Sequence, residues 1–414
     1  MTSKGRYQHN KYCYQSILRL ASLPPSHPLA PMIDQCARLC PQYHLTTFHI
    51  LLHLYPTNPL LIETIQSSSR HPTHLSPFTT TVLDSKETSI ILDNLAATTF
   101  RTHIYSDGSG IKGNVGSAAV WIKNGITHCT LQCHLGKLAK HTVYESELVG
   151  IILALEIVHK AGCSMPCPIC ISLDNQAAIK APRLNNMASG QHLIRALTHS
   201  ALHIQKACPS HQKTTLQWVV GHRDVLGNEL ADTAAKEATR GASSSRQTLP
   251  LILRTPLPLS ISALHQQHLS TLKNLWSLRW KKSPCYPRLC QTDPALPLDS
   301  FLCLITKAAL TRTQSSLLFQ LHTRHIPLNL HLHCIKKATS SCCLTCEAPR
   351  ETVHHFLLEC LSYDAHREPL CHRWKHLSQD ISFLLSDPKA IATTIDFIHA
   401  TGRLQQTLSE LSNH

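Results

Sequence analysis

The 414-residue sequence contains no apolar run long enough to cross a lipid bilayer. Its longest apolar stretch, Leu148 to Val158, is far shorter than the roughly 20 residues that a membrane-spanning helix needs. The N-terminal residues, MTSKGRYQHNKY, also lack the apolar region of a signal peptide. We therefore expect a protein that is neither inserted in a membrane nor secreted, but located in the nucleus or the cytoplasm.

Acidic residues are scarce relative to basic ones. The sequence has 25 Asp and Glu against 39 Lys and Arg, which gives a formal net charge of +14. This surplus favours a polyanionic partner, with a generally basic soluble protein as the alternative. Cysteine, in contrast, is abundant at 18 residues, and without a signal peptide we expect reduced thiols, some of them free to bind metal.

Four acidic residues occur near the expected ends of secondary-structure elements. Asp107 ends the extended run HIYSDGSG, Glu147 opens the apolar helix ESELVGIILALE, and Asp174 ends the run CPICISLDNQ. Asp232 lies on a later helix, GNELADTAAKEA, ten residues after His222. A cluster of ionised carboxylates repels itself unless cations are bound, and Mg²⁺ prefers oxygen ligands. Together the four acids predict a divalent-cation site, although each one alone would also suit a turn or a helix end.

The apolar periodicity around these acids predicts an α/β fold. Strands are expected at residues 101–107, 116–123, 126–135, 168–174 and 215–220, and helices at residues 147–160, 191–207 and 228–238. Three consecutive strands followed by alternating helices and strands indicate a mixed five-stranded sheet with helices on its faces. Farther along the chain, helices are expected around residues 269–282 and 304–324.

The order DGS, ExEL, LDNQ and WVVGHRDVLGNELADTAAKEA, spanning about residues 98–242, resembles type 1 ribonuclease H. The likeness is to the form attached to the reverse transcriptases of non-LTR retrotransposons. The resemblance implies an endonuclease that hydrolyses the RNA strand of RNA–DNA hybrids with two Mg²⁺ ions, which Mn²⁺ could replace. It also implies that His222 assists proton movement or product release.

The same resemblance assigns a role to each acid. Asp107 would bridge both ions, and Asp232 would complete the site of the ion that activates water. Glu147 and Asp174 would hold the ion at the leaving 3′ oxygen. These assignments come from the family and not from the spacing of the residues.

The resemblance also implies contacts to the minor groove, where the 2′-hydroxyl distinguishes RNA from DNA. The backbone of Gly108 and Ser109 and the side chains of Asn175 and Gln176 match the family positions. Asn114 is a further candidate, although the turn after DGS is one residue longer than in bacterial relatives. The basic handle helix of some bacterial members is not evident, so we expect weak substrate affinity in the absence of a polymerase.

No YADD-like polymerase motif occurs, so the chain resembles a C-terminal fragment of such a polyprotein. We expect a helical or irregular connector at residues 1–97, followed by the ribonuclease H domain at residues 98–242 and a linker at residues 243–260. A helical region at residues 261–378 comes next and contains a zinc module at about residues 334–372. A helical tail at residues 379–414 ends the sequence.

The segment CCLTCEAPRETVHHFLLEC contains three cysteines and a histidine at metal-ligand spacing. Cys343, Cys346, His355 and Cys360 suit a tetrahedral, structural Zn²⁺ ion and resemble the small zinc module that follows the nuclease in such elements. Cys342 and His354 are adjacent alternatives for two ligands, and a chance run of thiols is the other interpretation. We expect a segment with little apolar core, which the metal would fold.

Two other functions remain open. The first is a truncated copy that binds nucleic acid but no longer cleaves it, against which the presence of all four acids argues. The second is a transposase or junction resolvase of similar fold, which the helix-borne Asp232 and its preceding His222 disfavour. Outside the nuclease segment, Trp276 and Trp280 with their basic neighbours could track a phosphate backbone or form the solvated end of a helix.

Overall fold

The computed structural model describes most of the chain: residues 3–38, 45–55, 57–66, 76–82, 100, 102–123, 125–184, 187–208, 213–221, 225–295 and 301–405. The chain divides into two compact units, Met1–Leu272 and Lys273–His414, and each is described by itself. None of the helices in the described ranges combines the length and apolarity needed to cross a bilayer.

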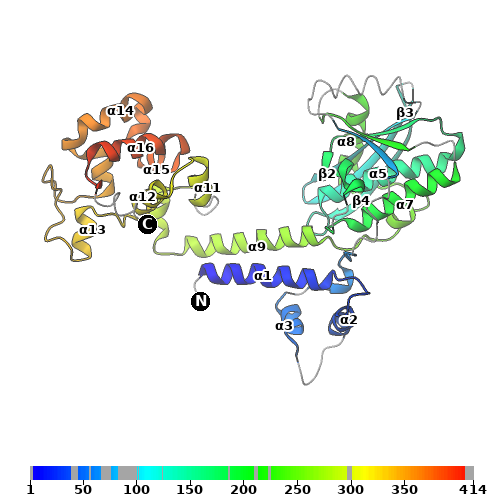
Figure 1. The fold of residues 1–414 in the computed structure, drawn as a ribbon, viewed down its shortest axis with the longest axis horizontal. Coiled ribbons are helices and arrows are strands. Elements are labelled where there is room, and N and C mark those ends of the chain that lie inside the picture. Colours follow the sequence, from blue (N-terminus) through cyan, green and yellow to red (C-terminus); the bar gives the residue numbers. More distant parts are fainter. Residues whose placement is uncertain are drawn as a thin grey trace. The chain divides into compact units, whose positions relative to one another are not determined.

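Within the described residues, the first unit is built on a mixed six-stranded sheet with the strand order β1-β6-β5-β2-β3-β4 (Figure 1). The strands are β1 (Phe78–Thr81), β2 (Thr102–Ile111), β3 (Asn114–Lys123), β4 (Ile126–Lys137), β5 (Ile169–Leu173) and β6 (Thr214–Trp218). β2, β3 and β4 are antiparallel, whereas β5 pairs in parallel with both β2 and β6. The mixed sheet is confirmed, with one strand more than the five expected.

The additional strand, β1, comes from the segment that the sequence analysis interpreted as a connector. It pairs in parallel with β6, from Phe78 opposite Thr214 to Thr81 opposite Gln217. Its sequence, FTTT, has the β-branched and aromatic residues that suit a strand. A strand of four residues is too short to show an alternating pattern, which explains why it was not expected.

Helices cover both faces of the sheet. α5 (Val143–Ala161) and α7 (Gln191–Ala207) contribute to the large apolar core, and α8 (Leu226–Thr239) packs on β2 and β3 through a second, smaller cluster. On β2, Ile104 belongs to the first core and Tyr105 to the second, as the alternation of a strand requires. Each fully buried Leu or Ile in α5 contributes roughly 1.5–3 kcal/mol to stability.

α5 begins at Val143, one turn before the expected start at Glu147. Thr142 caps the helix: its hydroxyl accepts from the Glu145 N–H, and the Glu145 carboxylate accepts from the Thr142 N–H at 2.7 Å. This reciprocal capping box satisfies N–H groups that would otherwise lack partners. Glu147 therefore lies in the second turn, already inside the helix.

The N-terminal helices form part of the first unit. α1 (Ser3–Ala21), α2 (Ala30–Arg38) and α3 (Thr47–Leu54) enclose a small core around Ile17, Leu18 and Phe48. α9 (Ile261–Lys281) begins beside α1, where His268 stacks on Tyr14 with ring centroids 4.2 Å apart (Figure 1).

A buried carboxylate, Glu63, joins three segments of this unit. It accepts hydrogen bonds from the Gly190 N–H at 2.7 Å, from the Ile261 N–H at 2.9 Å and from the Ser189 hydroxyl, and it lies 3.3 Å from His192 Nδ1. Burial alone would raise the pKa of Glu63, but these hydrogen bonds together lower it below its ordinary value. The ionised carboxylate thus fixes the N-terminal segment to the start of α7 and the start of α9.

The second unit is helical. Its helices are α10 (Tyr286–Thr292), α11 (Phe301–Lys307), α12 (Arg312–Thr323), α13 (Asn329–Cys334), α14 (Asp364–Trp374), α15 (Ile381–Ser386) and α16 (Pro388–Thr401). They enclose a core around Leu317, Phe356, Leu385 and Ile398. The expectation of a segment with little core is wrong, because Cys343 and Cys360 themselves belong to this cluster.

The single helix expected at residues 304–324 is also wrong, since the structure divides it into α11 and α12. Ala309 has a positive φ of 51°, which ends the first helix. Thr311 then starts the second through a capping box with Gln314. Apolar periodicity continues through the break, and only the capping residues mark it.

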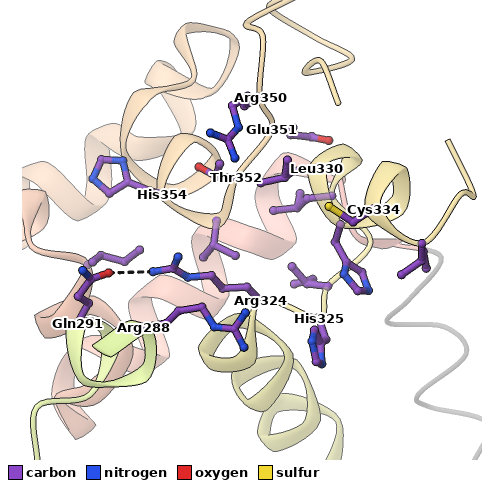
Figure 2. A pocket seen from close by; sticks show the side chains of 16 residues that line it. Arg288, Gln291, Arg324, His325, Leu330, Cys334, Arg350, Glu351, Thr352 and His354 are labelled. Atoms are coloured by element: carbon purple, nitrogen blue, oxygen red, sulfur yellow. Dashed lines mark hydrogen bonds between the residues drawn. The ribbon is translucent and has the colours of Figure 1, made fainter. Parts of the chain in front are cut away.

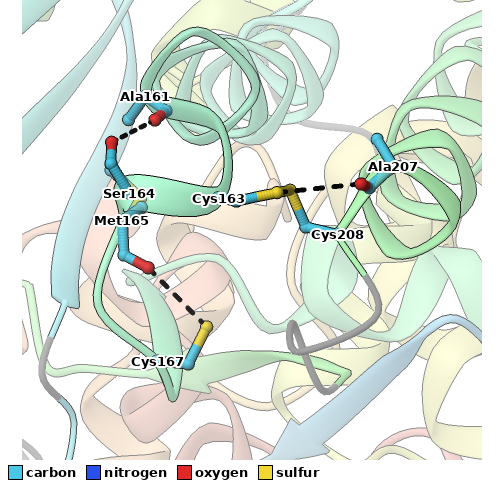
Figure 3. Close-up of a disulfide and its surroundings, with 7 residues drawn as sticks. All are labelled: Ala161, Cys163, Ser164, Met165, Cys167, Ala207 and Cys208. Carbon is cyan, nitrogen blue, oxygen red and sulfur yellow. Dashed lines mark hydrogen bonds between the residues drawn. A yellow bond between two sulfur atoms is a disulfide. The ribbon is translucent and has the colours of Figure 1, made fainter.

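A disulfide joins Cys163, directly after α5, to Cys208, directly after α7 (Figure 3). The two Cα atoms lie 5.5 Å apart although 45 positions separate the residues in the sequence. The sequence analysis expected reduced thiols, and the structure differs at this pair. Cysteine spacing does not show that α5 and α7 end at the same place.

We expect Glu63→Gln to lower the free energy of unfolding by roughly 2 kcal/mol at pH 7, because it leaves buried N–H groups with a weaker acceptor. A carboxylate with a lowered folded-state pKa stabilises fully above its ordinary value of 4.5, and this contribution is lost as the pH falls through the lowered pKa. The difference in the free energy of unfolding between wild type and Glu63→Gln, measured by urea unfolding, should therefore become smaller in acid. The exposed Glu368→Gln serves as the control, and equal stability of Glu63→Gln and this control at pH 7 would contradict the prediction.

Candidate active site

Three acidic side chains converge where strands β2 and β5 separate. The pairing of the two strands ends at Tyr105 opposite Ser172, just before Asp107 and Asp174. Glu147 reaches the same point from the second turn of α5. Carboxylate oxygens of Asp107, Glu147 and Asp174 lie within 4.8 Å of one another. The structure thus brings together three of the four acids that the sequence singled out.

The sequence analysis expected Asp107 to end its strand, and the structure places it within the strand instead. β2 continues to Ile111 in antiparallel pairing with β3. What ends near Asp107 is the pairing with β5, and that opening leaves space for carboxylates from both strands. An extended run read from sequence shows the strand but not which neighbours it keeps.

Gly108 allows α5 to approach β2 closely enough to deliver Glu147. A Cβ atom at this position would lie 2.4 Å from Ser146 Oγ and 2.6 Å from the Glu147 nitrogen. Distances this short require one of the elements to shift. The glycine in the DGS motif is therefore needed for packing beside the acids, independently of any contact to a substrate.

The three carboxylates raise one another's proton affinity. Burial, followed by the negative charges of Asp174 and Asp232, raises the pKa of Asp107 to about 7. Burial and then the charges of Asp107 and Asp174 raise the pKa of Glu147 well above its ordinary value, although Asn175 and the Gly108 N–H both donate to it. These shifts express the cost of gathering like charges in a buried place.

The donor set fits a hard divalent cation. All the converging ligand atoms are carboxylate oxygens, which Mg²⁺ prefers. Glu147 Oε2 is buried and has no hydrogen-bond partner among the described residues. A buried charged oxygen without a donor is costly, and a bound cation would both satisfy it and relieve the repulsion.

Asp232 stands beside this group but is not part of the close cluster. It is buried on α8, and its Oδ2 lies 2.5 Å from Lys236 Nζ, one turn along the helix. Its charge still raises the pKa of Asp107. The sequence analysis missed Lys236, although the spacing of four residues on a helix is the signal for such a pair. His222 lies outside the described residues, so its role stays a prediction.

The expected substrate-contacting residues lie on β2, at the start of β3 and at the start of α6. Gly108 and the buried Ser109 lie on β2, and Asn114 begins β3 opposite Ile111. Asn175 caps the short helix α6 (Gln176–Lys180): its Oδ1 accepts from the Ala177 and Ala178 N–H groups, and Gln176 is the first residue of the helix. The Asn175 side-chain oxygen therefore serves as a helix cap. That Asn175 and the other expected residues contact a substrate stays a prediction.

The expected zinc ligands form the second group, among the described residues, that could hold a metal ion. Ligand atoms of Cys343, Cys346, His355 and Cys360 lie within 4.8 Å of one another. Cys343 Sγ is 3.9 Å from Cys360 Sγ, and Cys346 Sγ is 3.2 Å from His355 Nε2. A tetrahedral Zn²⁺ with Zn–S bonds of about 2.3 Å places two sulfurs roughly 3.8 Å apart. The spacing of the four groups fits that geometry.

Burial distinguishes the expected ligand His355 from its sequence neighbour His354. His355 is buried with Nε2 toward the cysteines, and its Nδ1 faces the Glu359 carboxylate at 3.6 Å, on the side where metal-bound histidines commonly have an acceptor. The adjacent His354 is instead exposed, with Nδ1 3.0 Å from Glu359. Burial opposes ionisation of the Cys343 thiol, but hydrogen bonds from Thr345 and neighbouring groups outweigh it and lower the pKa to about 6.

The RNase H family model matches residues 100–240. None of the curated proteins of assigned function is similar enough to the chain to count as a match. Among solved structures, RNase H1 of the halophilic archaeon Halobacterium salinarum NRC-1 is 22% identical, with a TM-score of 0.25, and the match covers 34% of this chain and 99% of that one.

Two further structures are similar over about a third of the chain. LC11-RNase H1, from compost metagenomic material and solved in complex with an RNA/DNA hybrid, is 16% identical with a TM-score of 0.27, covering 33% of this chain and 98% of that one. The N-terminal RNase H domain of a Mycobacterium tuberculosis protein is 19% identical with a TM-score of 0.27, covering 35% and 100%. On the family match, residues 100–240 of this chain belong to the RNase H family.

Proposed function

We propose that the RNase H domain hydrolyses the RNA strand of an RNA–DNA hybrid, using two Mg²⁺ ions, and leaves 5′-phosphate and 3′-hydroxyl ends. The observation that carries the proposal is the convergence of Asp107, Glu147 and Asp174, with a buried Glu147 oxygen that has no donor among the described residues. The family match of this segment supports the same activity.

Each residue has a distinct task in this proposal. Bound Mg²⁺ supplies charge neutralisation at the phosphate and a lower pKa for the attacking water. Asp107 lies close enough to Asp174, Asp232 and Glu147 for their charges to interact, and Glu147 and Asp174 complete the cluster from α5 and the end of β5. Asp232, now held by Lys236, is the fourth carboxylate available to the cations. Lys236 holds that carboxylate in place on α8 through their contact.

We also propose that the domain derives from a retrotransposon reverse transcriptase and that the cysteine–histidine cluster holds a structural Zn²⁺ ion. The order of motifs around the four acids supports the first statement. The spacing of three thiols and an imidazole supports the second. The alternative is a remnant that still binds hybrids but no longer cleaves them.

Cleavage of a labelled RNA–DNA hybrid in Mg²⁺ should be lost, by at least about 100-fold, in Asp107→Asn, because the central anionic ligand is removed. Duplex DNA and single-stranded RNA should not be cut. Asp396→Asn, an exposed acid on α16, should cleave like wild type. If wild type binds the hybrid without cutting it, the silent remnant is the correct description.

With a chelator present to remove metal ions, Asp107→Asn should have a free energy of unfolding roughly 1 kcal/mol higher than wild type, because it relieves repulsion among the acids. A carboxyl whose folded-state pKa is raised from 3.8 to about 7 stabilises the fold below its ordinary pKa, and this contribution is lost as the pH rises toward 7. The melting temperature of the metal-free wild type should therefore fall over this range more than that of Asp107→Asn. Adding Mg²⁺ at pH 7 should raise the melting temperature of wild type alone, and an equal rise in both proteins would refute the metal site.

The purified chain should contain about one Zn²⁺ per molecule, and Cys343→Ser should lose it along with stability of the second unit. Metal analysis and the visible spectrum after Co²⁺ exchange measure the site directly. The exposed Cys285→Ser should keep the metal. Full zinc content in Cys343→Ser would contradict the assignment of this ligand.

A further inference from the structure

A pocket of about 840 Å³ opens in the second unit, and all the residues that line it belong to that unit (Figure 2). Three arginines line it: Arg288 from α10, Arg324 from the end of α12, and Arg350 from the segment between Cys346 and His355. Arg288 and Arg324 extend alongside each other, with Arg350 on the opposite wall (Figure 2). Three positively charged side chains that are far apart in the sequence thus line the same pocket.

These guanidinium groups have no carboxylate partner in the described part of the chain. Within the ranges that the structure describes, the Arg324 guanidinium donates to the neutral Gln291 Oε1, at 3.3 Å, and to no carboxylate. Burial and the neighbouring charge of Arg288 lower the pKa of Arg324, which shows that the two cations oppose each other. Cations gathered without an anion favour an anionic ligand.

The only carboxylate that lines the pocket, within the described residues, is already neutralised. Glu351 is buried and accepts two hydrogen bonds from Arg403, at 2.8 Å each, and one from the Asn329 N–H at 2.6 Å. This arrangement anchors the segment that carries Arg350. It also leaves the charge of the three lining arginines uncompensated.

Part of the remaining wall is apolar and aromatic, beside the polar Gln291 and Thr352. Ile326, Leu328 and Val353 are buried lining residues that belong to the core of the unit. The rings of His325 and His331 stack with centroids 5.2 Å apart at 29°. A flat, partly apolar ligand could pack here while its anionic group contacts the arginines. A nucleotide combines these two chemistries, since its base stacks and its phosphate is bound in bidentate fashion by guanidinium.

We infer that this pocket binds a nucleotide unit, with the phosphate at Arg288 and Arg324 and the base against the imidazole and apolar wall. The base is reachable only when unpaired, so the ligand is a single-stranded nucleic acid or a free nucleotide and not a duplex. The site goes beyond the proposed nuclease activity and does not depend on it. Its volume lies within the range of small-ligand pockets.

The test is binding of a fluorescently labelled oligouridylate to the full chain, followed by anisotropy at several salt concentrations. The double variant Arg288→Gln/Arg324→Gln should bind at least about 10-fold more weakly and lower the slope of log affinity against log salt by about 1. The control Lys337→Gln/Lys389→Gln removes the same charge at exposed positions outside the pocket and should bind like wild type.

Competition distinguishes the two sources of the nucleotide. If uridine monophosphate and unlabelled oligouridylate displace the labelled oligomer at similar concentrations, the ligand is a free nucleotide. If only the unlabelled oligomer displaces it, the ligand is a single strand. Equal affinity of the arginine variant and the lysine control would overturn the inference. Arg350→Gln provides an independent variant if the double variant fails to fold, which its melting curve shows. Hybrid cleavage should be unchanged in all of them, so failure of the nuclease proposal is detected separately.

Discussion

The repulsion among buried carboxylates is the constraint on which the RNase H domain depends. Asp107, Glu147 and Asp174 come from two strands and a helix, and their oxygens lie within 4.8 Å of one another. Such proximity costs free energy in the absence of a cation, as the raised pKa of Asp107 shows. The large core under α5 holds the acids in place against this cost. Stability stored in packing thereby maintains a site that is ready for divalent cations.

The second unit shows the same principle with softer ligands. Its thiols and imidazole are gathered at the edge of an apolar core, to which Cys343 and Cys360 belong. The segment between Cys346 and His355 also forms part of the wall of the basic pocket. A metal bound at the cluster would therefore limit the movement of Arg350, which connects the proposed zinc site to the proposed nucleotide site. In both units, groups that repel or lack partners mark the places where a ligand is expected.

Much of the nuclease domain could be read from the sequence because its signals are local. The strands of the meander, the long helix α5 and the carboxylates at DGS, ExEL and LDNQ all have short-range patterns. Other features depend on partners far along the chain. Glu63 contacts residues more than a hundred positions away, and Cys163 meets Cys208 only because two helices end together. The fourth acid, Asp232, was placed on the correct helix, but its pairing with Lys236 was not foreseen.

The sequence by itself determined the fold class, the family of residues 100–240, and most of the side chains that gather in the two candidate metal sites, since each follows from residue types at fixed spacing. The tertiary structure decided which groups meet. It added β1 to the edge of the sheet, separated α11 from α12, and brought Arg288, Arg324 and Arg350 around one pocket. The physical reason is that burial and electrostatic contact depend on distances in space, whereas sequence patterns record only the neighbours within a turn of helix or a stretch of strand.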